Sequence, residues 1–94
     1  MTRQAIVATA HASRYLQQLC KHWSHKFDVD YSPNAGRIAL PLGDVALKAG
    51  ETDLTIQITP TSVDNLEKLE DVVASHIDRF AHKEGGLTYD WQPA

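Results

Sequence analysis

Two stretches of the chain have apolar residues at helical spacing. In the first, apolar side chains recur at steps of three and four residues, at Ala12, Leu16, Leu19, Cys20 and Trp23. The second stretch repeats this spacing at Leu66, Leu69, Val73, Ile77 and Phe80. Residues three and four apart share one face of an α-helix, so each stretch predicts an amphipathic helix with one buried stripe. The two predicted helices have about four and about five turns.

Between these helices the apolar spacing changes to two. Alternation from Phe27 to Thr59 predicts four strands, with turns at 32–36, at Gly43-Asp44 and at 50–53. Gly43-Asp44 has the length and composition of a tight hairpin turn, so the segment predicts an antiparallel meander. One face of this sheet is apolar, and the other carries polar residues, namely Asp28, Asp30, Arg37, Lys48, Thr55, Gln57 and Thr59. Such a face suits water, a polar ligand or the sheet of a partner.

Shorter signals complete the element order. An apolar run over 4–8 predicts a first strand, and alternation over 87–91 predicts a last one. Thr61 or Ser62 is positioned to cap the second helix, and the pair Gly85-Gly86 to end it. The order is therefore β-α-β-β-β-β-α-β. Two helices with apolar stripes and a sheet with one apolar face predict an α+β two-layer sandwich with a mainly antiparallel sheet and both helices on one face.

Composition narrows the class of protein. The chain has 94 residues and one Cys, with 9 Lys+Arg against 12 Asp+Glu, a net charge of −3. This size predicts a single domain over 1–94, and one Cys excludes an internal disulfide framework. A membrane span needs about 20 apolar residues, and neither such a run nor a signal peptide is present, so a cytoplasmic protein is expected. A mildly acidic chain lacks the basic surface typical of nucleic-acid binding.

The five histidines are the first candidates for chemistry. His22 and His25 are neighbours on the first helix, whereas Cys20 and His22 differ by about 200° around its axis and cannot chelate one ion together. His76 lies about 50° from the centre of the second apolar stripe. It is predicted to be half-buried and turned toward the first helix, with one ring nitrogen bonded to backbone. A pairing of His22 with His76 is open to proton transfer, ligand binding or metal binding.

Other motifs add less. Cys20 lies on an apolar stripe, so a buried thiol is expected rather than a nucleophile. Basic residues on the outer side of the first helix, Arg14, Lys21, His25 and Lys26, predict a solvated face or a patch for an acidic partner. The chain contains no GxGxxG or P-loop motif, so no dinucleotide or P-loop phosphate site is indicated, and no cofactor can be named.

Several short motifs match those of a known family. They are Arg14-Tyr15-Leu16, Leu19-Cys20-Lys21-His22, His25-Lys26, Gly36-Arg37-Ile38 and His76-Ile77-Asp78-Arg79-Phe80-Ala81 with Glu84. Together they resemble a small bacterial family labelled domain of unknown function 2218, and the resemblance covers nearly the whole chain. It implies no catalytic residues, since the family has no established activity. Some members are similar to appendages or neighbours of siderophore-interacting flavin reductases, which implies a role near ferric-siderophore handling.

The resemblance also implies where to look for a site. Its polar motif positions on the two helices are candidate ligand-binding residues in a groove between them, namely Arg14, Tyr15, His22, His25, His76 and Arg79. His22 and His76 are the candidate metal ligands. The same side chains have a structural alternative, in which they tie the helices together, for example by pairing Arg79 with Glu84 or Asp71.

Three hypotheses of function follow. The leading one is a non-enzymatic binding or accessory module whose groove or polar sheet face contacts a small anionic ligand or a protein, such as a siderophore-interacting reductase. The alternatives are a metal-binding protein that uses His22 and His76, and a small enzyme that uses this pair for proton transfer. Homodimerisation through the open sheet face or a sheet edge is a further hypothesis. Neither a membrane nor nucleic acid is expected as a partner.

Overall fold

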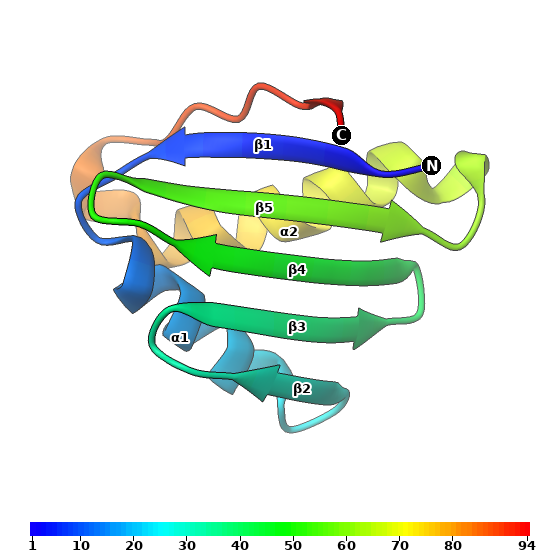
Figure 1. Cartoon of the computed structure of the whole chain (residues 1–94), viewed down its shortest axis with the longest axis horizontal. Helices are drawn as coiled ribbons and strands as arrows, with labels where there is room; N and C mark the ends of the chain where they lie inside the picture. The colour runs from blue at the N-terminus through cyan, green and yellow to red at the C-terminus, as the bar shows by residue number, and fades with distance from the viewer.

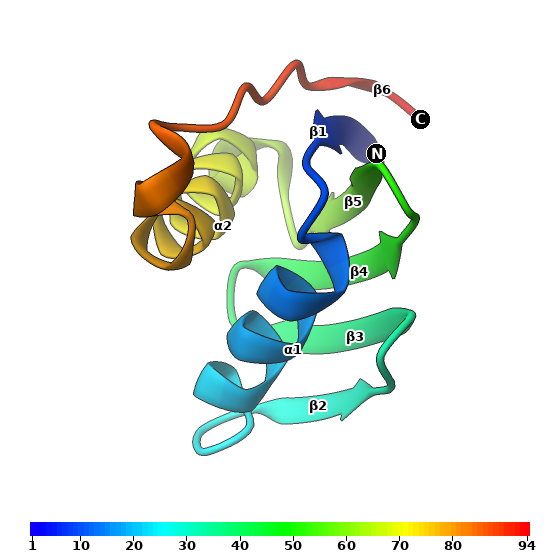
Figure 2. The ribbon, with the colours of Figure 1, turned by 90° about the vertical axis from the view of Figure 1, so that its left-hand side faces the viewer.

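A computed structural model describes all 94 residues as an antiparallel sheet covered on one face by two α-helices (Figures 1 and 2). The strands are β1 (Arg3–Ala8), β2 (Asp28–Tyr31), β3 (Ala35–Leu40), β4 (Gly43–Ala49), β5 (Asp53–Pro60) and β6 (Gln92–Pro93), and the helices are α1 (Ala12–Trp23) and α2 (Leu66–Phe80). The predicted α+β sandwich and its element order are confirmed. Neither helix is long and apolar enough to cross a membrane.

The sheet order is β2-β3-β4-β5-β1-β6. Strands β2 to β5 pair with their neighbours in the chain, as the alternation predicted, whereas β1 pairs with β5 on one side and β6 on the other. The two chain ends lie side by side, and the backbone N–H of Ala94 donates to the carbonyl oxygen of Thr2 at 3.0 Å. Both ends are therefore fixed to the same strand region.

The core lies between the sheet and the helices. Each of the five apolar residues predicted on the stripe of α1 is buried, and so is Tyr15. On α2, Leu69, Val73 and Ile77 are buried. The Cys20 side chain is fully buried, as expected, and burial raises the pKa of its thiol to about 11. Gly36 on β3 makes room for it, because a Cβ at that position would lie 2.7 Å from the Cys20 Sγ.

The hairpin turn between β3 and β4 was predicted two residues too late. It lies at Pro41-Leu42, since Leu40 pairs with Gly43 at the first position of β4. Proline suits a turn because its φ is fixed and it has no N–H to donate. Gly43 has a φ of +153°, and a Cβ there would lie 2.4 Å from the Thr59 carbonyl oxygen. This glycine therefore serves close backbone approach rather than the turn.

The ends of α2 also differ from the prediction. The helix begins at Leu66 after a 3₁₀ turn over Val63–Asn65, and no side chain caps either element. At the other end, α2 stops at Phe80, and a second 3₁₀ turn over His82–Glu84 follows. Gly85, at a φ of +77°, closes that second turn. Glycine thus ends the last helical turn of the region, as its conformational freedom allows, but not α2 itself.

The predicted last strand over 87–91 is wrong, because only Gln92 and Pro93 pair with β1. The segment before them still alternates in burial, with Leu87, Tyr89 and Trp91 half-buried against the core. Side-chain hydrogen bonds, rather than backbone pairing with a neighbouring strand, hold this segment. The Tyr89 hydroxyl donates to Asp78 Oδ1 at 2.9 Å, and Arg3 Nη2 donates to the Trp91 carbonyl oxygen at 3.1 Å. The period of two therefore reports side-chain burial, not strand pairing.

Candidate functional site

The helices α1 and α2 lie next to one another on the sheet (Figure 2), and polar side chains gather at two places where they meet. We call the first place the closed end. It consists of Thr9, His11, Tyr15 and Glu84. We call the second place the open end. It is a groove lined by His22, Trp23, His25, Lys26, Phe27 and His76.

Aromatic rings form the inner part of the open end. The Trp23 side chain is buried at the end of α1, and the centroid of its ring lies 4.8 Å from that of His76. The imidazole of His22 lies 5.5 Å from that of His76, centroid to centroid, and 6.3 Å from the Phe80 ring. The two histidines singled out from sequence are thus brought together across the helices.

A backbone contact fixes the tautomer of His76. Its Nδ1 lies 2.7 Å from the carbonyl oxygen of Val72, one turn earlier on α2. A carbonyl oxygen only accepts, so Nδ1 carries a hydrogen and donates it. In the neutral ring, Nε2 is then the nitrogen with a free lone pair. The half-buried position and the bond to backbone both confirm what the sequence predicted for His76.

The groove has a volume of about 470 Å³ and no acidic residue in its lining. Its polar side chains are three histidines and Lys26, and its apolar ones are Trp23 and Phe27. The sequence did not indicate that Phe27 would take part, because it lies beyond the helix. Tight bonds after α1 bring it there, since the N–H groups of Lys26 and Phe27 both donate to the Trp23 carbonyl oxygen, at 3.1 and 2.9 Å.

At the closed end the hydroxyl and carboxylate groups already have partners, and His11 takes part through its backbone N–H. The Glu84 carboxylate accepts from the Tyr15 hydroxyl and from the Thr9 hydroxyl, the latter at 2.9 Å. The Thr9 oxygen in turn accepts from the backbone N–H of His11 at 3.1 Å. The bond from Tyr15 lowers the pKa of Glu84, while burial, helped by the same carboxylate, raises the pKa of Tyr15. This end fastens the segment after α2 to the start of α1.

The predicted site residues are therefore divided. His22, His25 and His76 share the open end, Tyr15 belongs to the closed end, and Arg14 and Arg79 are exposed outside the groove lining. The predicted pairing of Arg79 with Glu84 or Asp71 is wrong, because Glu84 accepts hydroxyl groups and the one ion pair in the chain joins Arg3 to Glu70 at 3.4 Å. Ligand binding by Arg14, Tyr15 and Arg79 stays a prediction.

The histidine pair is the nearest approach to a metal-binding group. No three His, Cys, Asp or Glu side chains converge on one point in the way an ion would need. His22 and His76 alone would leave at least two positions of a tetrahedral ion to other ligands. Cys20 cannot contribute, because its thiol is buried in the core.

Comparison with known proteins gives a family but no activity. The family model described as "Uncharacterized protein conserved in bacteria (DUF2218)" matches residues 4–92. The NMR structure of PA4090 from Pseudomonas aeruginosa is similar over 100% of this chain and 98% of that chain, with 36% identity and a TM-score of 0.78. No curated protein is significantly similar. Because the family model and the solved structure both span almost the whole chain, the protein belongs to the bacterial DUF2218 family.

Proposed function

We propose that the protein is a binding module whose open end takes a small anion with a flat apolar part. The observation that carries this proposal is the lining of the groove, which combines three histidines and Lys26 with Trp23 and Phe27 and includes no carboxylate. The imidazoles of His22 and His25 and the ammonium of Lys26 can donate hydrogen bonds to an oxygen anion, whereas the neutral His76 ring, whose one N–H is donated to Val72, contributes a ring face. Aromatic rings bind flat apolar groups by stacking. A small carboxylate on an aromatic ring has both properties.

The helix itself does not favour an anion here. The groove lies at the carboxyl end of α1, where the backbone carries a partial negative charge. An anion would therefore be held by side-chain donors alone.

The test is an NMR titration with three probes that separate charge from shape. Benzoate has the ring and the charge, benzamide has the ring only, and acetate has the charge only. We expect benzoate to shift the Trp23 indole and the His22 and His76 imidazole signals in the millimolar range, and the other two probes to bind more weakly. Equal shifts with benzamide would contradict an anion site, and no shift with any probe would end the proposal.

Variants locate the binding on the protein. His22→Ala and Lys26→Ala each remove a donor from an exposed position, so both should weaken benzoate binding and leave the fold intact. His82→Ala is the matched control, because His82 is also exposed on the helical side but does not line the groove. Weakening by His82→Ala to the same extent would point to general charge attraction instead of the groove.

A specific observation favours metal binding as a second candidate function. Ligating histidines usually donate their second ring nitrogen to a carbonyl or carboxylate, as His76 does to Val72. Two imidazoles bound to one tetrahedral zinc ion have centroids about 5 Å apart, because each Zn–N distance is about 2.0 Å. The 5.5 Å between His22 and His76 is close to this value.

A zinc titration separates the two candidates. A metal site would saturate at one ion for each chain, shift His22 and His76 together and release protons on binding. It would be lost in His76→Ala and kept in His82→Ala. Unchanged spectra with zinc, combined with benzoate binding, would leave the anion site alone. The expected link to siderophore handling stays a prediction that suits either result, since siderophores are anionic oxygen ligands for metal.

A further inference from the structure

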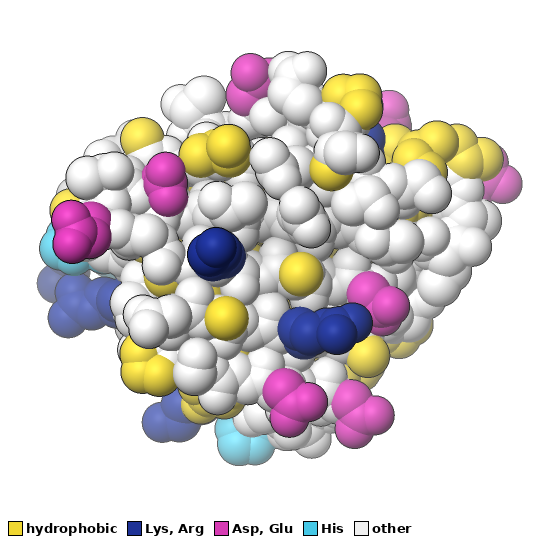
Figure 3. All heavy atoms as spheres, viewed as in Figure 1, with side chains coloured by type: hydrophobic (Ala, Val, Ile, Leu, Met, Phe, Trp, Pro, Cys, Tyr) yellow, Lys and Arg dark blue, Asp and Glu magenta, His cyan; other side chains and the backbone are white.

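The face of the sheet opposite to the helices carries a hollow of its own. Both helices pack on one side (Figure 2), so this face is bare. Figure 3 shows two basic side chains near its middle, with small hydrophobic side chains between them and acidic side chains around them. We call the sheet hollow a depression of about 410 Å³ over strands β3, β4 and β5. Its lining includes Ala35, Arg37, Ala46, Lys48, Thr55 and Gln57 and contains no acidic residue.

The strand register gives the sheet hollow its shape. Arg37 pairs with Ala46, and the next pair on the same face is Ala35 with Lys48. The four positions form a square, in which the two cations occupy one diagonal and the two alanines the other. Diagonal neighbours on one face of a sheet are about 7–8 Å apart, within reach of long side chains. Two long cationic side chains therefore stand beside a floor of methyl groups, and the space above the alanines stays open.

Strand β5 borders the sheet hollow with neutral polar groups. Thr55 pairs with Lys48, and Gln57 pairs with Ala46. The hydroxyl of Thr55 can donate a hydrogen bond. The Gln57 amide donates one N–H to Gln4 Oε1 at 2.8 Å and has a second N–H to give. A guanidinium, an ammonium, a hydroxyl and an amide therefore border the same space.

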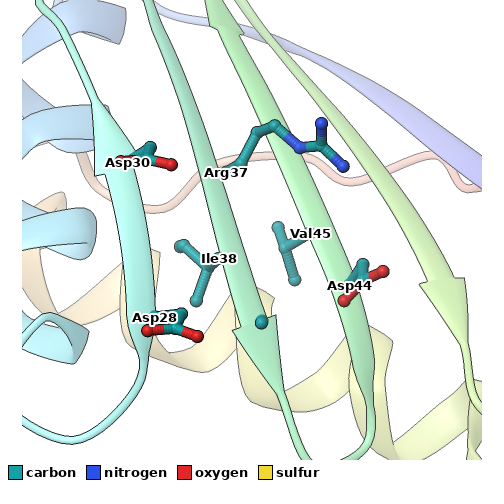
Figure 4. A pocket seen from close by; sticks show the side chains of 7 residues that line it. Asp28, Asp30, Arg37, Ile38, Asp44 and Val45 are labelled. Carbon is teal, nitrogen blue, oxygen red and sulfur yellow. The ribbon is translucent and has the colours of Figure 1, made fainter.

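The two cations are not neutralised by a carboxylate of the chain. Neither Arg37 nor Lys48 takes part in an ion pair. The acidic residues Asp28, Asp30 and Asp44 line a neighbouring hollow, and Figure 4 shows Arg37 extended toward β4, away from Asp30. Asp44 lies four residues before Lys48 on β4, a distance of about 13 Å along the strand. Two unpaired charges of one sign repel one another, so an anion between them is favoured.

We propose that the sheet hollow binds a phosphate group, either as inorganic phosphate or as a small phosphate monoester. A guanidinium donates two parallel hydrogen bonds to a phosphate, and an ammonium binds it as a point charge. A phosphate dianion matches the charges of Arg37 and Lys48, and its other oxygens can accept from Thr55 and Gln57. The acidic residues beside the hollow would repel an anionic membrane laid against the whole face, so the ligand is expected to be free in solution. The site is separate from the open end, which lies on the helical side.

The experiment is an NMR titration with inorganic phosphate, compared with sodium chloride at the same ionic strength. We expect the backbone amides of Ala46, Lys48 and Thr55 and the Arg37 Nε–H to shift with one Kd of about 1–10 mM. Acetate, with one charge and two oxygens, should bind about threefold or more weakly. Vesicles of phosphatidylcholine and phosphatidate should leave these signals unchanged. Shifts no larger than those from chloride, equal binding of acetate, or binding of the vesicles alone would overturn the proposal.

Four variants of equal charge locate the site. Arg37→Gln and Lys48→Gln each remove one cation from the sheet hollow and should weaken phosphate binding by about threefold or more. Arg79→Gln and Lys83→Gln are the matched controls, because both side chains are exposed outside the sheet. Each variant changes the net charge from −3 to −4, so general attraction would weaken binding equally in all four and overturn the proposal. Unchanged affinity in Arg37→Gln and Lys48→Gln would do the same. The amide spectrum of each variant verifies that the fold is kept.

The open end also contains cations, so binding there has to be told apart. Phosphate at the open end would shift the Trp23 indole signal and would be weakened by Lys26→Ala. Phosphate in the sheet hollow should bind to Lys26→Ala with the affinity of the wild type. If phosphate shifts Trp23 and leaves the signals of β4 unchanged, the sheet site is wrong and the proposed function of the open end stands.

Discussion

The two places where α1 meets α2 both contain polar side chains but have opposite properties. At the closed end, every hydroxyl and carboxylate oxygen that faces inward has a partner inside the chain, and Tyr15 is buried. At the open end, the donors of His22, His25 and Lys26 are exposed, and His76 keeps one ring nitrogen free. Polar residues on a helix motif are therefore not evidence of a ligand by themselves. A structural contact differs from a ligand site in that the hydrogen bonds of its polar side chains are already made within the chain.

The largest test of this comparison is Trp23→Ala. Trp23 belongs to the core and also forms the inner wall of the open end, so its loss should lower the free energy of unfolding by about 3–5 kcal/mol. Urea denaturation measures the change. His22→Ala removes the exposed neighbour and should change stability by no more than about 0.5 kcal/mol. Equal stability of the two variants would contradict the assignment of Trp23 to both the core and the inner wall of the open end.

A smaller loss of stability is expected from the variant Tyr15→Phe at the closed end. Removing the hydroxyl deletes its hydrogen bond to Glu84 and should lower the free energy of unfolding by about 1 kcal/mol. Tyr31→Phe is the matched control, since Tyr31 is 43% exposed and its hydroxyl makes no hydrogen bond within the chain. The same urea midpoints for both variants would show that the closed end fastens nothing.

The smallest expected effect is the pH dependence of folding stability that Glu84 produces at the closed end. The pKa of Glu84 is lowered on folding by the bond from Tyr15, so its carboxylate stabilises the folded state above the ordinary carboxyl range. That contribution is lost as the pH falls through the lowered pKa. Glu84→Gln lacks it at every pH, so the stability difference from wild type should shrink between about pH 6 and about pH 3.

The exposure of Glu84 keeps this pH effect small, because solvent screens an exposed charge. Glu51→Gln is a suitable control, since Glu51 is exposed in a turn and accepts no side-chain hydrogen bond. Urea midpoints at several pH values give the comparison. A Glu84→Gln difference that stays constant with pH would contradict the assigned role of its charge.

Sequence predicted the fold well wherever one physical cause produces one pattern. The stripes of α1 and α2 and the strand alternation arise from burial, and they gave the elements and their layers. The prediction failed where two causes share a pattern. Glycine at 43 was assigned to a turn because turns and close backbone contacts both select glycine, and 87–91 was assigned to a strand because a side chain alternates in burial with or without a ladder.

The site was predicted only in part for a similar reason. Helical phase placed His22 and His76 on facing sides, and the structure brings their rings together. The partner of Tyr15 could not be identified, because Glu84 is 69 positions away and reaches it through a 3₁₀ turn that no spacing predicts. Phe27 was assigned to the sheet alone, since nothing in its alternation reveals the tight bonds to the Trp23 carbonyl that turn the chain back.

The place of β1 in the sheet sets the order in which the protein can fold during synthesis. β1 and α1 are translated first, yet β1 pairs only with β5 and β6, and the stripe of α1 packs on strands that begin at Asp28. Ribosomes add about 5–20 residues each second, so several seconds separate the emergence of α1 from that of β5. Through that interval β1 has no strand to pair with, and α1 gains its sheet only as β2, β3 and β4 emerge one after another. The meander of β2 to β5 can form by local hairpins. β1, although it is translated first, can join the sheet only after β5 has been made.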